Sequence, residues 1–146
     1  MKEIKVKVTK EEATKLPLYM TDGAAGMDVY AEIKEDLVIK PLERVLVPTG
    51  LKVEIPYGFE IQVRPRSGLA IKHGITLLNT PGTIDSDFRG EIKVIMINIS
   101  NEEFKIKPRE RIGQLVLNKV YKCVWEETGE LEESDRGQGG FGHTGK

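Results

Sequence analysis

Few side chains in this 146-residue sequence are suited to disulfide or zinc chemistry, because it contains one cysteine, Cys123, and only two histidines. A single cysteine cannot form a disulfide within the chain, which favours a reducing, cytoplasmic location. The same shortage argues against a tetrahedral zinc site. Any bound metal is therefore expected to be a hard cation held by carboxylates or by the oxygens of a substrate.

The sequence also lacks a strong excess of either charge and any long apolar run. Its formal net charge is −1, whereas nucleic-acid grooves usually show a clear basic excess, so no nucleic-acid partner is expected. No stretch approaches the length of a transmembrane helix, and residues 1–5 do not resemble a secretory leader, so no membrane partner is expected. The chain is long enough for one domain with a substantial core.

Most apolar residues alternate with polar ones, which is the period of a half-buried β-strand. The alternation covers 4–8, 51–55 and 59–63, and 112–120 is a further candidate strand. Prolines recur at strand-length intervals and mark turns or edges, while the one short helical turn expected lies over 67–72. The sequence therefore predicts an all-β fold, a sandwich or jelly roll of short strands.

The segment 91–100 differs from the other predicted strands because both of its faces are apolar. Three large apolar side chains lie on each face: Ile92, Val94 and Met96 on one, and Ile95, Ile97 and Ile99 on the other. Two interpretations stay open at this point. Either the strand is covered on both sides within one subunit, or its second face meets another subunit.

Residues 134–146 form a glycine-rich segment beyond the last predicted strand, and the β-domain is expected to span 1–133. Five of the ten residues in 136–145 are glycine, which cannot build a core and costs much backbone entropy to order. However, the glycine amides, the Arg136 guanidinium and the Phe141 ring together suit a ligand that carries phosphates and a ring. The alternative is a flexible tail without a function.

Arginine is concentrated in segments rich in glycine and proline, although lysine outnumbers it 15 to 7 overall. One such segment is Arg64–Leu69, where Gly68 frees the backbone next to a hydroxyl. Arg66, the Ser67 hydroxyl and exposed amides there would form a phosphate cradle. The alternatives are ion pairs with glutamates for the arginines and a capped turn for Ser67.

Residues 79–92 begin with Asn-Thr-Pro-Gly and end with Arg-Gly-Glu-Ile, a pattern that predicts a hairpin at a sheet edge. The open backbone groups of such a hairpin suit recognition of a flat base. Asp85 and Asp87 lie two residues apart, so one carboxylate is expected to face a site while the other serves the structure. The alternative for each is an Asx-turn.

Two further polar residues are candidates for a site. Asp28 follows a run of small residues, and its carboxylate is placed to order water around a cation, with a simple turn as the alternative. Gln114 lies within the predicted strand 112–120. Its amide either points at a phosphate or bonds to a neighbouring strand.

Taken in order and spacing, the segments AAGMDVYA, RPRSGLA, NTPGTIDSDFRGEI, RIGQL and RGQGGFGHTG closely resemble the five motifs of trimeric deoxyuridine triphosphatases (dUTPases). The resemblance spans residues 24–145 and implies a jelly-roll homotrimer of the β-clip type with three active sites between subunits. It further implies Mg²⁺-dependent hydrolysis of dUTP to dUMP and pyrophosphate. Such an activity limits uracil in DNA and supplies dUMP for thymidylate synthesis.

The resemblance also implies roles for individual residues. Asp85 would be the base that deprotonates the water attacking the α-phosphorus, and Asp28 would support metal-bound water. The residues that match phosphate contacts are Arg66, Ser67, Gly68 and Gln114. Those that match uracil and sugar contacts are Asn79, Thr83, Ile84, Phe88 and Lys93. The closing tail, expected to be mobile, is matched by Arg136 toward the γ-phosphate, Phe141 over the uracil, and Gly142.

Two positions depart from the usual motifs. Phe88 stands where tyrosine is common, so its ring can stack on deoxyribose without the phenol's hydrogen bond, and His143 replaces a serine in the tail. Two rival functions are a related dCTP deaminase and a non-enzymatic trimeric scaffold that binds nucleotide or protein. The glutamate base and the serine-rich motif expected of the deaminase are not evident.

Overall fold

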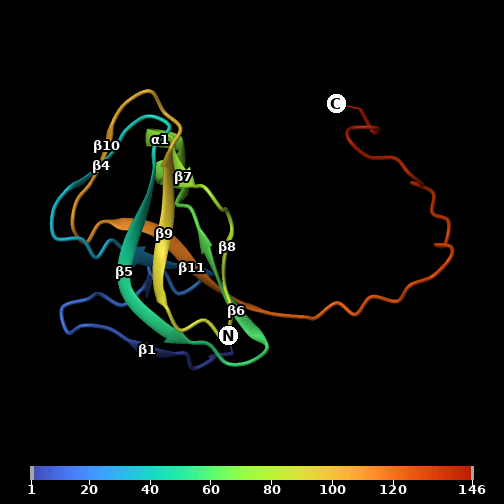
Figure 1. The fold of residues 1–146 in the computed structure, drawn as a ribbon, viewed down its shortest axis with the longest axis horizontal. Coiled ribbons are helices and arrows are strands. Elements are labelled where there is room, and N and C mark those ends of the chain that lie inside the picture. The colour runs from blue at the N-terminus through green and yellow to red at the C-terminus, as the bar shows by residue number, and fades with distance from the viewer. Residues whose placement is uncertain (1, 146) are drawn as a thin grey trace.

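A computed structural model describes residues 2–145, which form a β-sandwich of antiparallel strands with an extended C-terminal segment (Figure 1). One sheet has the order β1 (Lys7–Thr9), β5 (Arg44–Glu54), β9 (Glu91–Asn98), β7 (Ile75–Leu77). The other has the order β2 (Leu18–Tyr19), β3 (Met27–Tyr30), β11 (Arg111–Lys119), β6 (Phe59–Arg64), β8 (Gly82–Ile84). A small third sheet pairs β4 (Leu37–Ile39) with β10 (Phe104–Ile106). The predicted all-β sandwich is confirmed.

The core lies between the two large sheets and is built by the alternation seen in the sequence. On the long pair β5–β9, Val47 lies opposite Val94, and both side chains are fully buried. From the other sheet, Ile61 and Leu115 turn inward and are 3% and 2% exposed. Each such side chain contributes about 1.5–3 kcal/mol when it is fully buried, so the alternating positions hold the two sheets together.

Most predicted elements are present, with shifted ends. The segments 51–55, 59–63, 91–100 and 112–120 fall largely in β5, β6, β9 and β11. The expected strand over 4–8 is shorter than predicted, because β1 begins at Lys7 and pairs only with Lys52–Glu54. Residues 2–145 contain one helix, α1 (Ser67–His73), which ends at Gly74, whose φ of 63° is the left-handed conformation that stops a helix. Among the residues described, no helix has the length and apolar character needed to cross a bilayer.

The two apolar faces of β9 are covered unequally. Ile92, Val94 and Met96 are at most 2% exposed, whereas Ile99, just beyond the strand on the other face, is 61% exposed. Leu46, which lies opposite Ile95 on β5, is 56% exposed. Together with Ile95 and Ile97 these residues form the outer apolar face. Within residues 2–145 this face is left partly open, which favours the interpretation that another subunit covers it.

The prediction of a hairpin over residues 79–92 is wrong in its pairing. β8 lies at the edge of the five-stranded sheet and pairs with β6, while β9 is central in the other sheet and pairs with β5 and β7. The intervening chain therefore crosses from one sheet to the other. Both ends of the segment carry the turn residues that suggested a hairpin, but the two strands bury their apolar sides against different partners.

After Lys119 the chain leaves the sandwich and runs away from it (Figure 1). Tyr121, Trp125 and Leu131 are more than 80% exposed. Ser134–Gly145 folds into successive tight turns closed by its own backbone, such as the bond from the Gly137 N–H to the Ser134 carbonyl. The functional division predicted between residues 133 and 134 stays a prediction.

Candidate functional site

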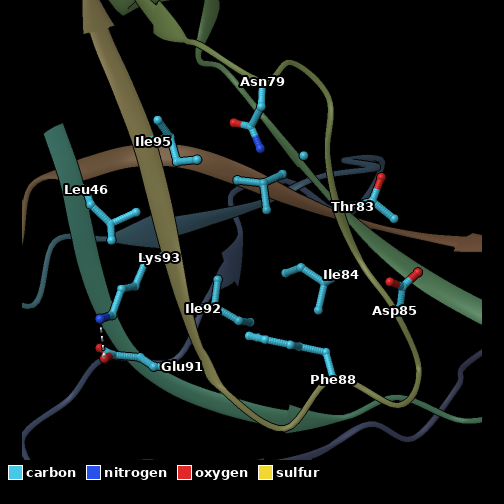
Figure 2. A pocket seen from close by; sticks show the side chains of 12 residues that line it. Leu46, Asn79, Thr83, Ile84, Asp85, Phe88, Glu91, Ile92, Lys93 and Ile95 are labelled. Atoms are coloured by element: carbon cyan, nitrogen blue, oxygen red, sulfur yellow. Dashed lines mark ion pairs between the residues drawn. The ribbon is translucent and has the colours of Figure 1, made fainter. Parts of the chain in front are cut away.

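A cavity of about 270 Å³ opens where the chain crosses between the two sheets (Figure 2). Its wall includes six residues singled out in the sequence: Asn79, Thr83, Ile84, Asp85, Phe88 and Lys93. Its remaining lining is Leu46, Val63, Gly82, Glu91, Ile92 and Ile95. We call this cavity the β8 pocket. It is near the lower end of small-molecule sites in size, and its apolar walls with a few polar groups are typical of them.

An edge strand supplies one side of the β8 pocket. Gly82, Thr83 and Ile84 pair with β6 along one edge only, because β8 is the last strand of its sheet. Backbone N–H and C=O groups on the other edge are thus available to a ligand. A planar group with donors and acceptors at its rim is the kind of ligand that such an edge can recognise.

The turn after β8 carries the acidic and aromatic side chains of the pocket. The Phe88 N–H donates to the Asp85 carbonyl at 3.2 Å, which closes a turn over 85–88. Asp85 is exposed and lies at the rim of the cavity, while Phe88, 43% exposed, directs its ring across the floor (Figure 2). Of the two aspartates in the segment, Asp85 lines the pocket and Asp87 does not.

A second polar group, the Asp28 cluster, consists of Asp28, Arg66, Arg111 and Gln114. Asp28 lies on β3 opposite Gln114 of β11 and is 3% exposed. Its Oδ1 accepts a hydrogen bond from Gln114 Nε2 at 3.0 Å, and its Oδ2 accepts one from Arg111 Nη1 at 2.9 Å. Arg66 Nε lies 4.0 Å from the same Oδ2. The second, fourth and first sequence motifs therefore meet at one buried carboxylate.

The contacts of the Asp28 cluster settle which structural alternatives hold for the residues that the sequence left open. Asp28 lies in a strand rather than a turn, and Gln114 bonds across to the neighbouring strand. Arg66 pairs with an aspartate, not with one of the glutamates. Ser67 is exposed and is not a cap, because Arg66 occupies the N-cap position without a side-chain cap bond. The Ser67 hydroxyl thus has no capping role that competes with a ligand.

Arg111 is a member of the cluster that the sequence did not single out as a site residue. A register shift between Arg111 and Gly113 places an extra residue in β11 opposite β3. Such a bulge re-aims a side chain, and here the Arg111 guanidinium reaches the buried carboxylate. Its place in a glycine-containing segment three residues before Gln114 was the only signal, and the bulge itself has no clear signature in the sequence.

The described residues offer few direct ligands for a divalent cation. Among residues 2–145 no three His, Cys, Asp or Glu side chains come together as a metal cage. Both oxygens of Asp28 already accept hydrogen bonds, although a carboxylate retains further lone pairs that can accept from water. The side chains present are therefore compatible with a divalent cation whose ligands are mainly substrate oxygens and water.

The C-terminal residues predicted to bind substrate lie apart from the β8 pocket. Arg136 Nε donates to the Gly139 carbonyl at 2.7 Å, and the Phe141 side chain is fully exposed. Gly142 has a φ of 88°, so it belongs to the tight turns of the segment. Figure 1 shows this segment extended away from the sandwich. Within one chain the structure does not bring Arg136, Phe141 or Gly142 to the other site residues.

The Asp28 cluster is also separate from the β8 pocket. None of Asp28, Arg66, Ser67, Gly68 or Gln114 is among the residues that line the pocket. β3 lies three strand positions from β8 in the sheet, which corresponds to about 14 Å at the usual strand spacing. One chain thus carries two separate groups of candidate site residues.

Comparisons with known proteins extend over the whole chain. The family model described as dUTPase matches residues 12–145. A protein of Fusobacterium nucleatum subsp. nucleatum, named deoxyuridine 5′-triphosphate nucleotidohydrolase, is 65% identical over 146 residues, covering 100% of both chains. A protein of the same name from Thermoanaerobacter sp. is 54% identical over 144 residues, covering 97% of each.

Solved structures give the same picture of the fold. A mutant dUTPase of Staphylococcus bacteriophage 80alpha with dUpNHpp aligns with a TM-score of 0.85 at 23% identity, covering 97% of this chain and 99% of that one. A mutant dUTPase from phage phi11 of S. aureus, described with a structural Mg(II) ion, aligns with a TM-score of 0.78 at 19% identity. That alignment covers 89% of this chain and 100% of the phage chain.

Proposed function

The chain belongs to the dUTPase family, and we propose that it hydrolyses dUTP to dUMP and pyrophosphate at the β8 pocket. The observation that carries the proposal is the convergence of Asn79, Thr83, Ile84, Asp85, Phe88 and Lys93 on one cavity beside an edge strand. The reaction removes dUTP, which limits uracil in DNA, and it yields dUMP, the precursor for thymidylate.

The β8 pocket suits the nucleoside end of the substrate. Backbone groups of Thr83 and Ile84, with the Asn79 amide, bind the rim of the uracil. The Phe88 ring packs against the deoxyribose and leaves no room for a 2′-hydroxyl. A pocket that crowds a hydroxyl and offers it no partner disfavours ribonucleotides, because the hydroxyl must then be desolvated without compensation.

Asp85 supplies the base for the chemical step. A water molecule attacks the α-phosphorus, its proton passes to the Asp85 carboxylate, and the bond from the α-phosphorus to the oxygen bridging to the β-phosphorus breaks. Pyrophosphate leaves with that oxygen, and the proton later returns to solvent. The position of Asp85 at the rim of the pocket supports this role, since the α-phosphate follows the sugar out of the cavity.

The Asp28 cluster and the start of α1 suit the triphosphate. The Arg66 guanidinium, the Ser67 hydroxyl, the Gly68 amide and the Gln114 side chain bind phosphate oxygens, while the buried Asp28 holds Arg66 and Gln114 in position. A Mg²⁺ ion bound by the triphosphate would neutralise part of its charge. Asp28 would help to hold such an ion through a water molecule.

A homotrimer completes the site, because a phosphate-binding cluster and a nucleoside pocket that do not meet within one chain must meet between chains. The outer apolar face supports assembly, since Leu46 and Ile99 are more than half exposed. The segment after β11 supports it as well: Tyr121, Val124 and Trp125 are each more than 80% exposed. Large apolar side chains exposed together are typical of interfaces.

Residues 134–146 close the site over bound nucleotide. Arg136 meets the γ-phosphate, Phe141 covers the uracil, and the adjacent Gly142 allows the turn that follows the ring. Ordering a glycine-rich segment is costly, so it folds down only where these contacts offset the cost. Closure excludes water other than the attacking molecule and aligns the α-phosphorus with Asp85.

Pyrophosphate release with dUTP, dTTP, dCTP and UTP as competing substrates tests the proposal. We expect rapid release from dUTP with Mg²⁺ present, a large loss when Mg²⁺ is chelated, and little release from the other three nucleotides. Loss of the amine from dCTP would instead identify a deaminase. Nucleotide binding without any turnover would identify a binding scaffold.

A further inference from the structure

The ring of Phe88 lies directly over the backbone of Gly90. A Cβ atom placed on Gly90 would lie 2.5 Å from Cζ of Phe88 and 2.9 Å from Cε2, and the third nearest atom belongs to the same ring. Carbon atoms in contact prefer separations of about 3.5–4.0 Å. Any side chain at position 90 would therefore push the ring away by about 1 Å or more.

The absence of a side chain at position 90 is not required by the backbone. Gly90 is not among the glycines with positive φ, so an alanine there would adopt an ordinary conformation. The neighbouring backbone is held in place independently, because Arg89 Nη1 donates to the carbonyls of Ser86 and Phe88 at 2.7 and 3.0 Å. An added methyl group is thus accommodated by rotation of the Phe88 side chain.

We propose that Gly90 is a positioning residue that seats the Phe88 ring against the sugar and thereby sets the preference for deoxyribonucleotides. The inference rests on the proposed function of the β8 pocket. Phe88 has no hydroxyl with which to anchor its ring by a hydrogen bond. Its orientation therefore depends on packing, and the flat surface of Gly90 is where that packing occurs.

Gly90 acts on sugar selection more than on the chemical step. The turn over 85–88 is closed by the bond from the Phe88 N–H to the Asp85 carbonyl, and Arg89 fixes the same turn from outside. Rotation of the ring leaves these bonds intact, so Asp85 keeps its place. Displacing the ring by about 1 Å opens or reshapes the wall beside the sugar, which is where close fit matters most.

The test compares kcat/KM for dUTP and UTP in wild type, Gly90→Ala, Phe88→Ala and the double variant. Gly23→Ala is the matched control, because a Cβ atom on Gly23 meets nothing within 4 Å and its φ is not positive. For Gly90→Ala we expect the dUTP/UTP ratio to fall about tenfold, mainly through KM. The control should leave the ratio unchanged, and the melting temperatures should match.

The double variant separates a positioning role from an independent one. Once the ring is removed by Phe88→Ala, the additional Gly90→Ala change should have no further effect on the ratio. Additive losses would overturn the inference, as would an unchanged ratio in Gly90→Ala alongside a reduced ratio in Phe88→Ala. A wild-type protein that does not prefer dUTP would instead overturn the proposed function itself.

If Gly90→Ala does not fold, the melting temperature of the double variant decides. If the only obstacle at position 90 is the Phe88 ring, the double variant should regain the wild-type melting temperature, which would support the contact. A double variant that remains unfolded would show that Gly90 is needed by the backbone, and the inference would be wrong.

Discussion

The β8 pocket and the Asp28 cluster are built on opposite principles. In the cluster, each oxygen of the buried Asp28 carboxylate accepts a hydrogen bond from the same chain, one from Arg111 and one from Gln114. In the pocket, Asp85 is exposed at the rim and the strand beside it has an unpaired edge. Under the proposed function, the charged groups that hold phosphates are fixed in advance, whereas the groups that recognise the base and carry out the chemistry are left open. Preorganised positive charge lowers the cost of binding an anion.

The largest effect on activity is expected from a substitution in the β8 pocket. Asp85→Asn preserves the shape of the side chain but removes its ability to accept a proton. We expect kcat for dUTP to fall about 10²–10⁴-fold with nucleotide binding largely kept. Steady-state turnover and equilibrium binding of dUMP measure the two quantities. Near-normal turnover would assign the base to another residue.

A substitution on the outer apolar face tests whether pocket and cluster must come from different copies. Ile97→Glu would bury an unpaired charge at the contact, which costs several kcal/mol and should prevent assembly. Three chains of 16.4 kDa give about 49 kDa, so light scattering should shift from that mass to 16.4 kDa. Activity should be lost together with assembly. A wild-type protein that is a stable monomer at micromolar concentration would contradict the proposal.

Removing the C-terminal segment tests whether the β8 pocket must be closed over the bound nucleotide for turnover. A chain ending at Ser134 should remain folded and trimeric, because none of residues 135–145 belongs to the buried core. We expect turnover at saturating dUTP and Mg²⁺ to fall about 10²-fold through loss of alignment. Phe141→Ala should act in the same direction with a smaller loss. Equal rates for truncated and full-length protein would identify the segment as an inert appendage.

A substitution in the Asp28 cluster is expected to lower the stability of the fold. Arg111→Ala leaves the 3%-exposed Asp28 without its shortest partner. We expect unfolding in denaturant to become easier by about 1–3 kcal/mol, the usual cost of an unsatisfied buried acceptor. Arg136→Ala is the matched control, since Arg136 is exposed and bonds only within its own segment among the residues described. Equal stability of both variants would show that the cluster does not depend on Arg111.

The smallest effect on stability is expected from a surface ion pair whose N–O distance is similar to that between Arg111 and Asp28. Lys7 Nζ lies 3.0 Å from Glu54 Oε1, and this hydrogen bond lowers the pKa of Glu54 below its usual value. A lowered folded-state pKa stabilises the protein above the unfolded pKa, and this contribution is lost as the pH falls through the folded one. Because both side chains are exposed, Lys7→Ala should barely change the melting temperature at neutral pH and should slightly flatten its fall in acid.

The strands could be predicted from the sequence because their signal is local. Alternation over 51–55 and 59–63 reflects which side chains face the core, and the structure follows it. The pairing of residues 79–92 could not be predicted in the same way. Its turn residues are consistent with a hairpin, yet β8 pairs with β6 and β9 with β5, choices that depend on strands far away in the sequence.

In the candidate site too, the local features could be predicted from the sequence and the long-range contacts could not. The composition of 64–69 and 79–92 indicated phosphate and base recognition, and the motifs indicated which residues belong together. Arg111 could not be identified as a member of the Asp28 cluster from the sequence, because the position of its side chain depends on a bulge in β11. The sequence also did not reveal that the Asp28 cluster and the β8 pocket are apart in a single chain, because spacing along the chain says nothing about the face on which a side chain ends.

The separation of the Asp28 cluster from the β8 pocket has a genetic consequence. In an assembly with sites between copies, a chain with Asp85→Asn still offers an intact cluster to its neighbour, and a chain with Arg66→Ala still offers an intact pocket. Two inactive alleles expressed together should therefore regain part of the activity by forming mixed oligomers, although neither functions alone. Conversely, one defective allele should reduce the output of a normal one, because each of its chains takes part in more than one site.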